Sequence, residues 1–406
     1  MLTLKTPIIE KECSSIDIQE ELLSIYKEGL LEDTLPFWLD KCIDKTHGGY
    51  ITSLDRDGSI LDTDKGVWVQ GRFSWLLAHL CNHFEKRPEW IEASLSGIEF
   101  LDKYGFDPQD GRMWFHLSRD GKPIRKRRYS FSETFASIAY AEYGKATDSE
   151  EYKNKAIDVF HKYQNFLNSP DQNPKFTGNR PSIGIGRYMI DIVTCQILRE
   201  AADFEQASEY IDQFIEKIVT FFIKGDIQCV METVSTEGDI IDHFDGRLLN
   251  PGHAIECAWF IMKEGKIRNK GSYIQLGCKM LDWMWERGWD KEHGGILYFR
   301  DVYDKPVQEY WHDMKFWWPH NETIIATLMA YSLTGENKYA EMHQKVHNWT
   351  YRHFPDEEYG EWFGYLHRDG RISSSFKGNM WKGPFHMPRM QFECWQILEE
   401  MKRQRI

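Results

Sequence analysis

The 406-residue sequence contains no apolar run that approaches the roughly 20 residues a membrane-spanning helix needs. Its N-terminus, MLTLKTPIIEKECSS, lacks the apolar core of a signal peptide. Basic residues are not in excess either, since the formal net charge is −13. That charge argues against nucleic acid or an anionic membrane as a partner. We therefore expect a cytoplasmic protein that binds neither nucleic acid nor membrane.

Paired cysteines are also missing. The eight cysteines are scattered without the spacing of a disulfide framework or a zinc ribbon, which is typical of a reduced, intracellular chain. No G-x-x-x-x-G-K-[ST] loop is present to cradle a phosphate. Aromatic residues, in contrast, make up 15% of the chain and include 16 Trp. Most such rings belong in a core, but dense Trp and Tyr also line sugar sites.

Four segments repeat one pattern, an Asp and a Gly-rich turn followed by a second turn. They begin at Asp44, Asp107, Asp290 and Asp356. Three of the second turns read Arg-Asp-Gly, and the fourth contains Asp304. A fainter copy covers Met231–Gly238, and a degenerate one lies near Pro170–Arg180. Each predicts two short strands joined by a turn, and six such periods indicate one repetitive architecture rather than several domains.

Helical periodicity fills the stretches between these turns. In residues 318–335, apolar residues recur at helical spacing. One set of helices follows the turns, at 66–83, 130–145, 186–203, 251–264, 318–335 and 387–402. The other set precedes them, at 17–40, 87–104, 149–167, 205–223, 271–287 and 338–353. Twelve helices that alternate between inner and outer positions predict an all-α (α/α)6 barrel with short β-hairpins, formed by a single domain over residues 1–406.

The candidate chemistry lies at the starts of the inner helices. Asn250 is a strong N-cap and Pro251 suits the first helical position, which places His253 in the first turn with Glu256 on the same face. The helix dipole should keep His253 mostly neutral. Residues at other inner-helix starts are Arg72, Glu133, Arg187, Glu322 and His386. For Glu133 we favour a structural role in a capping box with Ser130.

Two histidines that face each other across a cleft suit a two-base proton shuttle near neutral pH. One would remove a proton α to a carbonyl, and the other would return one to the opposite face. Glu256 or Glu322 would fix the tautomer of each histidine and stabilise its imidazolium. An arginine would stabilise the developing enediolate.

These same stretches carry a resemblance. NPGHAIECAWF, KFWWPHNE, EYGEWFGYLHRDG and KGPFHMPR resemble, in this order, motifs of the N-acylglucosamine 2-epimerase family, which includes renin-binding protein and the cellobiose 2-epimerases. The resemblance is strongest from Arg247 to Arg389. It implies an (α/α)6 barrel, usually a homodimer, that epimerises C2 of a ring-opened sugar and needs no chemical cofactor. ATP or another nucleotide would act as an activator that is not consumed.

By this resemblance, His253 and His386 are the catalytic bases, supported by Glu256, Glu322 and Arg72. Arg247, Lys315 and Trp318 would lie in the substrate pocket. Further substrate-binding candidates at the helix starts are Trp68, Glu133, Met189 and Asn250. The third inner helix lacks a histidine that the isomerase and cellobiose epimerase branches carry, since it reads Arg187-Tyr-Met-Ile-Asp-Ile192. The protein is thus expected to interconvert N-acetyl-D-glucosamine and N-acetyl-D-mannosamine.

Other interpretations remain open at this stage. The enzyme could be an epimerase or aldose–ketose isomerase for a neutral sugar such as mannose, glucose or cellobiose. A glycoside hydrolase would need two opposed carboxylates, for which Glu133 and Glu322 are candidates, but His253 and His386 would then be idle. A non-catalytic carbohydrate-binding protein is a third class. A metal site built from His253, Glu256, His320 and Glu322 is disfavoured because paired histidines need no metal for this chemistry, and His320 is expected to be structural.

Overall fold

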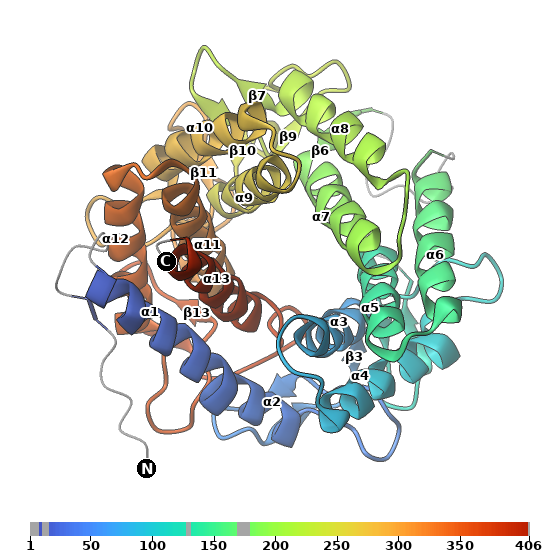
Figure 1. Cartoon of the computed structure of the whole chain (residues 1–406). Helices are drawn as coiled ribbons and strands as arrows, with labels where there is room; N and C mark the ends of the chain where they lie inside the picture. The colour runs from blue at the N-terminus through green and yellow to red at the C-terminus, as the bar shows by residue number, and fades with distance from the viewer. Residues whose placement is uncertain (1–7, 10–15, 127–130, 169–178, 405–406) are drawn as a thin grey trace.

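A computed structural model describes residues 8–9, 16–126, 131–168 and 179–404, and shows a ring of helices (Figure 1). Six inner helices surround the centre. They are α3 (Val67–His83), α5 (Phe131–Thr147), α7 (Ile185–Ala201), α9 (Pro251–Ile267), α11 (Trp317–Thr334) and α13 (His386–Arg403). The outer layer consists of α1 (Ile16–Glu28), α2 (Leu35–Lys41), α4 (Pro88–Phe100), α6 (Glu150–Asn168), α8 (Ala207–Lys217), α10 (Gly271–Gly288) and α12 (Asn337–His353). The (α/α)6 barrel is therefore confirmed.

One predicted outer helix differs from the structure. Residues 17–40 form two helices, α1 and α2, separated by the π-helical turn Gly29–Thr34. Similar π-turns extend α4 and α8, at Leu101–Gly105 and Ile218–Phe222. Hydrophobic periodicity could not reveal such turns. A π-turn is a single wider turn within a helix, and apolar residues continue through it. Among the described residues, no helix is long and apolar enough to cross a membrane.

The two layers differ in how they are buried. Every residue of α11 from Trp317 to Ala330 is buried, because an inner helix contacts the barrel interior on one side and an outer helix on the other. In the outer α8, the buried residues Ala207, Ile211, Phe214 and Ile215 form a single stripe. The outer helices α4, α6, α8, α10 and α12 each pack on the inner helix that precedes them, and α1 packs on α13. The first helix of the chain thus closes the ring against the last.

Short strands cluster at one end of the ring, where the inner helices begin. Four strands lead directly into inner helices: β3 (Lys65–Gly66), β6 (Ile183–Gly184), β10 (Leu248–Leu249) and β12 (Lys315–Phe316). Each pairs with a strand of the next repeat, respectively β4 (His116–Leu117), β9 (Thr233–Val234), β11 (Arg300–Asp301) and β13 (Tyr365–Leu366). Three predicted within-repeat hairpins are confirmed, β1–β2 (Ser53–Leu54, Ile60–Asp62), β4–β5 (Pro123–Arg125) and β13–β14 (Ile372–Ser374). In the segments that begin at Asp290 and Met231 the prediction is wrong, because β11 and β9 pair with β10 and β6 instead. A further hairpin, β7–β8 (Ile223–Lys224, Cys229–Val230), lies just before Met231. Most of the degenerate copy near Pro170–Arg180 lies outside the described residues.

The repeated Asp is the centre of a buried ionic brace. Asp290 accepts hydrogen bonds from Lys315 Nζ (3.0 Å) and from Arg368 Nε (2.8 Å) of the following repeat. The same arrangement recurs as Lys65–Asp44–Arg119 and Lys377–Asp356–Arg56. In the last of these, the arginine of the first Arg-Asp-Gly turn binds the aspartate of the final repeat. In three of the four motifs, the repeated Asp therefore joins neighbouring repeats and closes the ring, whereas Asp107 binds Lys126 of its own repeat.

Replacing Asp356 with Ala should destabilise the barrel strongly. Asp356 is buried, and its loss leaves the fully buried Lys377 without its ion-pair partner, at a cost of roughly 3–5 kcal/mol in unfolding free energy. Removing the exposed Glu286 that pairs with Lys291 should cost at most about 1 kcal/mol. Denaturant and thermal unfolding of both variants measure the difference. Equal midpoints for the two variants would contradict the brace.

Candidate active site

The first candidate histidine is fixed at the start of α9. Asn250 caps the helix by accepting a hydrogen bond from the His253 backbone N–H (3.1 Å), which confirms the predicted cap. The imidazole Nδ1 of His253 donates to the carboxylate of Glu232, at 3.0 and 3.1 Å from its two oxygens. Glu232 lies between β8 and β9, and its backbone bonds Ile185 and Leu248 at the starts of two inner helices. About a third of the His253 side chain stays exposed.

The second candidate histidine is the first residue of α13. Its Nδ1 donates to Glu322 Oε1 of α11 at 2.7 Å, and the side chain is almost fully buried. The same oxygen of Glu322 accepts from Arg389 Nη2 (2.7 Å), and its other oxygen accepts from Trp259 Nε1 (2.8 Å). Burial raises the pKa of Glu322, while the Arg389 guanidinium and the Trp259 N–H oppose that rise.

Arg389 connects the two predicted carboxylates. It donates from one nitrogen to Glu256 and to Glu322, and both acids are buried with it. The pKa of Arg389 is raised because these carboxylates outweigh the effect of burial. Glu256, Glu322 and His386 lie close enough together to hold a metal ion, but the guanidinium already supplies the positive charge between the two acids.

Trp318 brings the histidines together. Its ring centroid lies 4.9 Å from that of His253 and 5.7 Å from that of His386. The close approach depends on Gly252, because a Cβ there would lie 2.7 Å from the Trp318 ring. With each Nδ1 bound to a carboxylate, each Nε2 has no hydrogen-bond partner among the described residues. Both rings therefore have one nitrogen held and one available.

The surroundings shift the pKa values of the two imidazoles in opposite directions. Burial lowers the pKa of His386 well below its ordinary value, and the cationic Arg389 and Arg72 lower it further. For His253, burial also acts to lower the pKa, but the carboxylate of Glu232 outweighs it, so the pKa is raised. This direction for His253 is opposite to the one expected from the helix dipole alone. The site therefore pairs an imidazole whose pKa is lowered, His386, with one whose pKa is raised, His253.

Arg72 lies in an aromatic enclosure near the same site. Its guanidinium carbon is 4.6 Å from the Trp68 ring centroid, 4.2 Å from that of Phe135 and 4.5 Å from that of Phe385. Burial lowers the pKa of Arg72 to about 9, so it stays charged at neutral pH. Its Nε is buried and has no hydrogen-bond partner in the part of the chain that the structure describes. A cation with an unsatisfied donor is suited to bind an oxyanion.

The pairing of acids with histidines partly corrects the sequence interpretation. Glu322 orients His386 as expected, but Glu256 binds Arg389, and the acid that binds His253 is Glu232. Sequence reasoning missed Glu232 and Arg389 as site residues, although both lie within stretches recognised as repeats or motifs. Nothing local marked them, because each acts on a side chain that the barrel brings in from a distant helix.

Several other predicted residues are occupied elsewhere. Arg247 donates to Asp242 and Asp301, each at 2.8 Å, and Lys315 is fully buried in the brace with Asp290. Glu133 accepts from Arg112 Nε (2.9 Å) and from the Met113 backbone N–H (3.1 Å). The charged groups of Arg247, Lys315 and Glu133 therefore stabilise the strands and turns around the site. The proposed capping partner of Glu133, Ser130, lies outside the described residues.

The remaining candidates have defined places. Trp68 donates from Nε1 to the Met380 carbonyl (3.0 Å) and covers Arg72, and Met189 is buried on α7. His320 accepts from the Ile296 N–H (2.9 Å) through Nε2 and donates to the Phe316 carbonyl (2.6 Å) through Nδ1. Burial lowers its pKa to about 3. Both nitrogens of His320 are used, so its predicted structural role is confirmed.

Replacing Glu232 with Gln should lower the pKa of His253, because the neutral amide no longer stabilises the imidazolium. In the native protein this pairing stabilises the fold below the ordinary histidine pKa of about 6.5. The contribution is lost as the pH rises through the raised pKa. A pH titration of the imidazole signals by NMR measures the shift, with Glu237→Gln on the neighbouring turn as control. An unchanged pKa in Glu232→Gln would contradict the assignment.

Comparisons with known proteins identify the family of the chain. The profile of the N-acylglucosamine 2-epimerase (GlcNAc 2-epimerase) family matches residues 49–386. The N-acylglucosamine 2-epimerases of Bos taurus and Homo sapiens are 36% and 34% identical, over 94% of this chain and 93% and 91% of theirs. The cellobiose 2-epimerase structure from Spirochaeta thermophila superposes with a TM-score of 0.82 at 19% identity, covering 95% of this chain and 99% of that one. The chain belongs to the N-acylglucosamine 2-epimerase family.

Proposed function

We propose that the protein interconverts N-acetyl-D-glucosamine and N-acetyl-D-mannosamine by moving the C2 proton of the open-chain sugar. One observation carries this proposal. Two imidazoles rest against the same indole, each held at Nδ1 by its own carboxylate and each with Nε2 available. A base and an acid placed in this way suit removal of a proton on one side of a carbon and return of a proton on the other.

The resting charges set the first turnover. Neutral His386 takes the C2 proton on Nε2, and the electron pair of the C–H bond forms the C1–C2 double bond while the aldehyde oxygen becomes an enolate. Arg72 stabilises that negative charge with its unsatisfied donor. The imidazolium of His253 then gives its Nε2 proton to the opposite face of C2, and the aldehyde forms again. In the reverse reaction the histidines exchange roles.

Glu322 and Arg389 control how readily His386 accepts and releases a proton. Glu322 stabilises the imidazolium that His386 becomes, and Arg389 prevents that imidazolium from forming before substrate is present. Glu232 supports the imidazolium of His253 in the same manner. Each histidine therefore has a carboxylate that stabilises its imidazolium. A reversible reaction requires this, because each histidine carries the proton in one of the two directions.

The choice of an N-acetylated sugar rests on relatives rather than on a contact in the site. The relatives at 34–36% identity are named N-acylglucosamine 2-epimerases, and α7 begins without a histidine. Membership of the family further supports four finer proposals. The reaction needs no chemical cofactor, a nucleotide such as ATP activates the enzyme without being consumed, the chain forms a homodimer, and it works in the cytoplasm.

Proton NMR of N-acetyl-D-mannosamine with the purified protein in D2O, with and without ATP, tests the reaction. We expect N-acetyl-D-glucosamine signals to grow while the C2 proton signal is lost. Faster conversion with ATP would support the nucleotide proposal. Exchange in mannose, glucose or cellobiose alone would move the substrate to a neutral sugar. Exchange in none of these sugars would overturn the proposed function.

Single replacements of the two histidines should separate the half-reactions. His253→Asn and His386→Asn should each abolish epimerisation, because one face of C2 then lacks an acid or base. Each variant retains one base, so it should still exchange the C2 proton of one epimer with D2O, and the two variants should differ in which epimer that is. A matched control is His312→Asn. Near-normal epimerisation by either catalytic variant would contradict the two-base assignment.

A further inference from the structure

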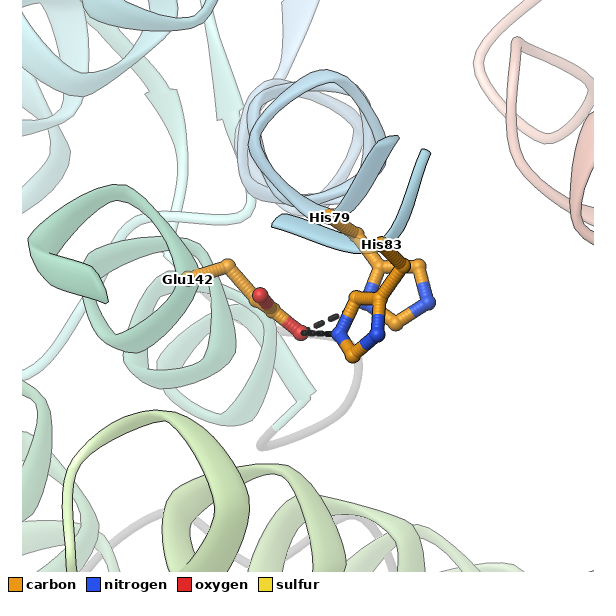
Figure 2. Close-up of side chains that lie close together, drawn as sticks. All are labelled: His79, His83 and Glu142. Carbon is orange, nitrogen blue, oxygen red and sulfur yellow. Dashed lines mark hydrogen bonds and ion pairs between the residues drawn. The ribbon is translucent and has the colours of Figure 1, made fainter. Parts of the chain in front are cut away.

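A second cluster of ligating side chains lies at the opposite end of the barrel from the histidine pair. His79 and His83 occupy the last turns of α3, and Glu142 comes from the last turns of the adjacent α5. Figure 2 shows both imidazoles directed at the same carboxylate oxygen. The proposed reaction uses none of these three residues.

The distances define a compact group of donors. His79 Nδ1 lies 2.6 Å from Glu142 Oε1, and His83 Nε2 lies 4.0 Å from the same oxygen. His83 Nε2 is buried and makes no hydrogen bond to any residue within the described ranges. A fourth donor comes from α7, where Glu200 Oε1 lies 3.3 Å from His83 Nε2. One ligand atom each of His79, His83 and Glu142 therefore lies within 4.8 Å of the others, and Glu200 of the neighbouring α7 approaches this group from the His83 side.

The surrounding contacts hold these donors in place. The other oxygen of Glu142 accepts from Asn82 Nδ2 at 2.6 Å, and the same amide also donates to the Glu142 carbonyl. His79 stacks on Trp75, with ring centroids 4.9 Å apart and the planes 21° apart. Carboxylate and imidazole orientations fixed by such outer contacts are typical of metal sites.

Electrostatics at this end favour a cation. His83 is the last residue of α3, and Glu200 lies in the last turn of α7. The C-terminal ends of these helices carry partial negative charge. The carboxylates of Glu142 and Glu200 add to it.

We propose that His79, His83, Glu142 and Glu200 form a binding site for Zn2+ that ties α3, α5 and α7 together. His-x-x-x-His on one helix face is a zinc spacing, and two imidazoles with two carboxylates complete a tetrahedral set. Bonds of about 2.0–2.1 Å place tetrahedral donors about 3.3 Å apart. The His83–Glu200 distance already meets this value. Glu142 Oε1 has to move away from His79 and toward His83 by less than an ångström each, and the Glu200 carboxylate has to turn toward His79 and Glu142 to complete the set.

The site is independent of the proposed epimerisation. His79 and Glu200 line a cavity inside the ring whose walls also include Phe385 and Arg389, so an ion reaches the site through the barrel interior. The competing description is a plain ion pair, in which a protonated His79 holds Glu142 and no metal binds. Metal binding separates the two descriptions without any activity measurement.

The test is titration of the metal-free, full-length protein with Zn2+ by calorimetry and with Co2+ by visible absorption. We expect one equivalent per chain and the intense d–d bands of tetrahedral Co2+. His83→Ala and Glu142→Gln should weaken binding by more than the roughly 10–100-fold that loss of an outer contact costs. Asn82→Ala should fall within that range, and His293→Ala on the surface should bind as the native protein does.

Each other outcome counts against the site. Absence of stoichiometric Zn2+ binding by the native protein would overturn the proposal in favour of the ion pair. Binding retained by both His83→Ala and Glu142→Gln, but lost in His386→Ala, would place the metal at Glu256, Glu322 and His386 instead and also overturn it. Circular dichroism of each variant shows that lost binding does not come from lost folding.

Discussion

The active site depends on one buried cation. Arg389 lies between Glu256 and Glu322, and without its charge two buried carboxylates would face each other inside the barrel. Burying unpaired charges costs several kcal/mol each, so the three residues form a unit that is stable only when complete. His386 belongs to the same unit, because Glu322 holds its Nδ1 while burial and the charge of Arg389 lower its pKa. The character of the base thus follows from a balance of charges on α9, α11 and α13.

The barrel supplies the geometry that this balance requires. Strands that enter the inner helices pair with the next repeat, and the Asp braces bind an arginine from the next repeat. Helix starts that are far apart in sequence are thereby held at one end of the ring. His253 and His386 can then both contact the ring of Trp318, although each belongs to a different repeat.

Much of this arrangement was predictable from local patterns. Helical periodicity and the repeated Asp-Gly turns predicted the ring, and Asn250–Pro251 predicted the start of α9. The direction in which the His253 pKa shifts was not predictable. A helix terminus contributes about 0.3–1 kcal/mol at a typical site, whereas a carboxylate at hydrogen-bonding distance interacts with an imidazolium by about 4 kcal/mol at an effective dielectric constant of 20. Glu232 supplies that carboxylate, and only the folded ring brings it to His253.

For Lys315, Arg247 and Glu133, the sequence could not show which neighbour each charged group would bind. Sequence resemblance and position placed them near the substrate, but a charged residue at a helix start can equally satisfy a turn or a strand. The structure shows each with its polar atoms bound to such a neighbour. Arg72 differs, because aromatic rings cover its faces and its Nε has no partner. Burial without a partner, rather than charge at a helix start, distinguishes a group that is available for substrate.

The central claim is that two different residues handle the two faces of C2. The most direct measurement is the isotopic content of the first N-acetyl-D-glucosamine formed from N-acetyl-D-mannosamine in D2O, determined by mass spectrometry before the reverse reaction contributes. Two bases predict that this early product carries one solvent-derived deuterium at C2. Early product that retains the original C2 proton would show that a single group carries the proton between faces, and would contradict the account.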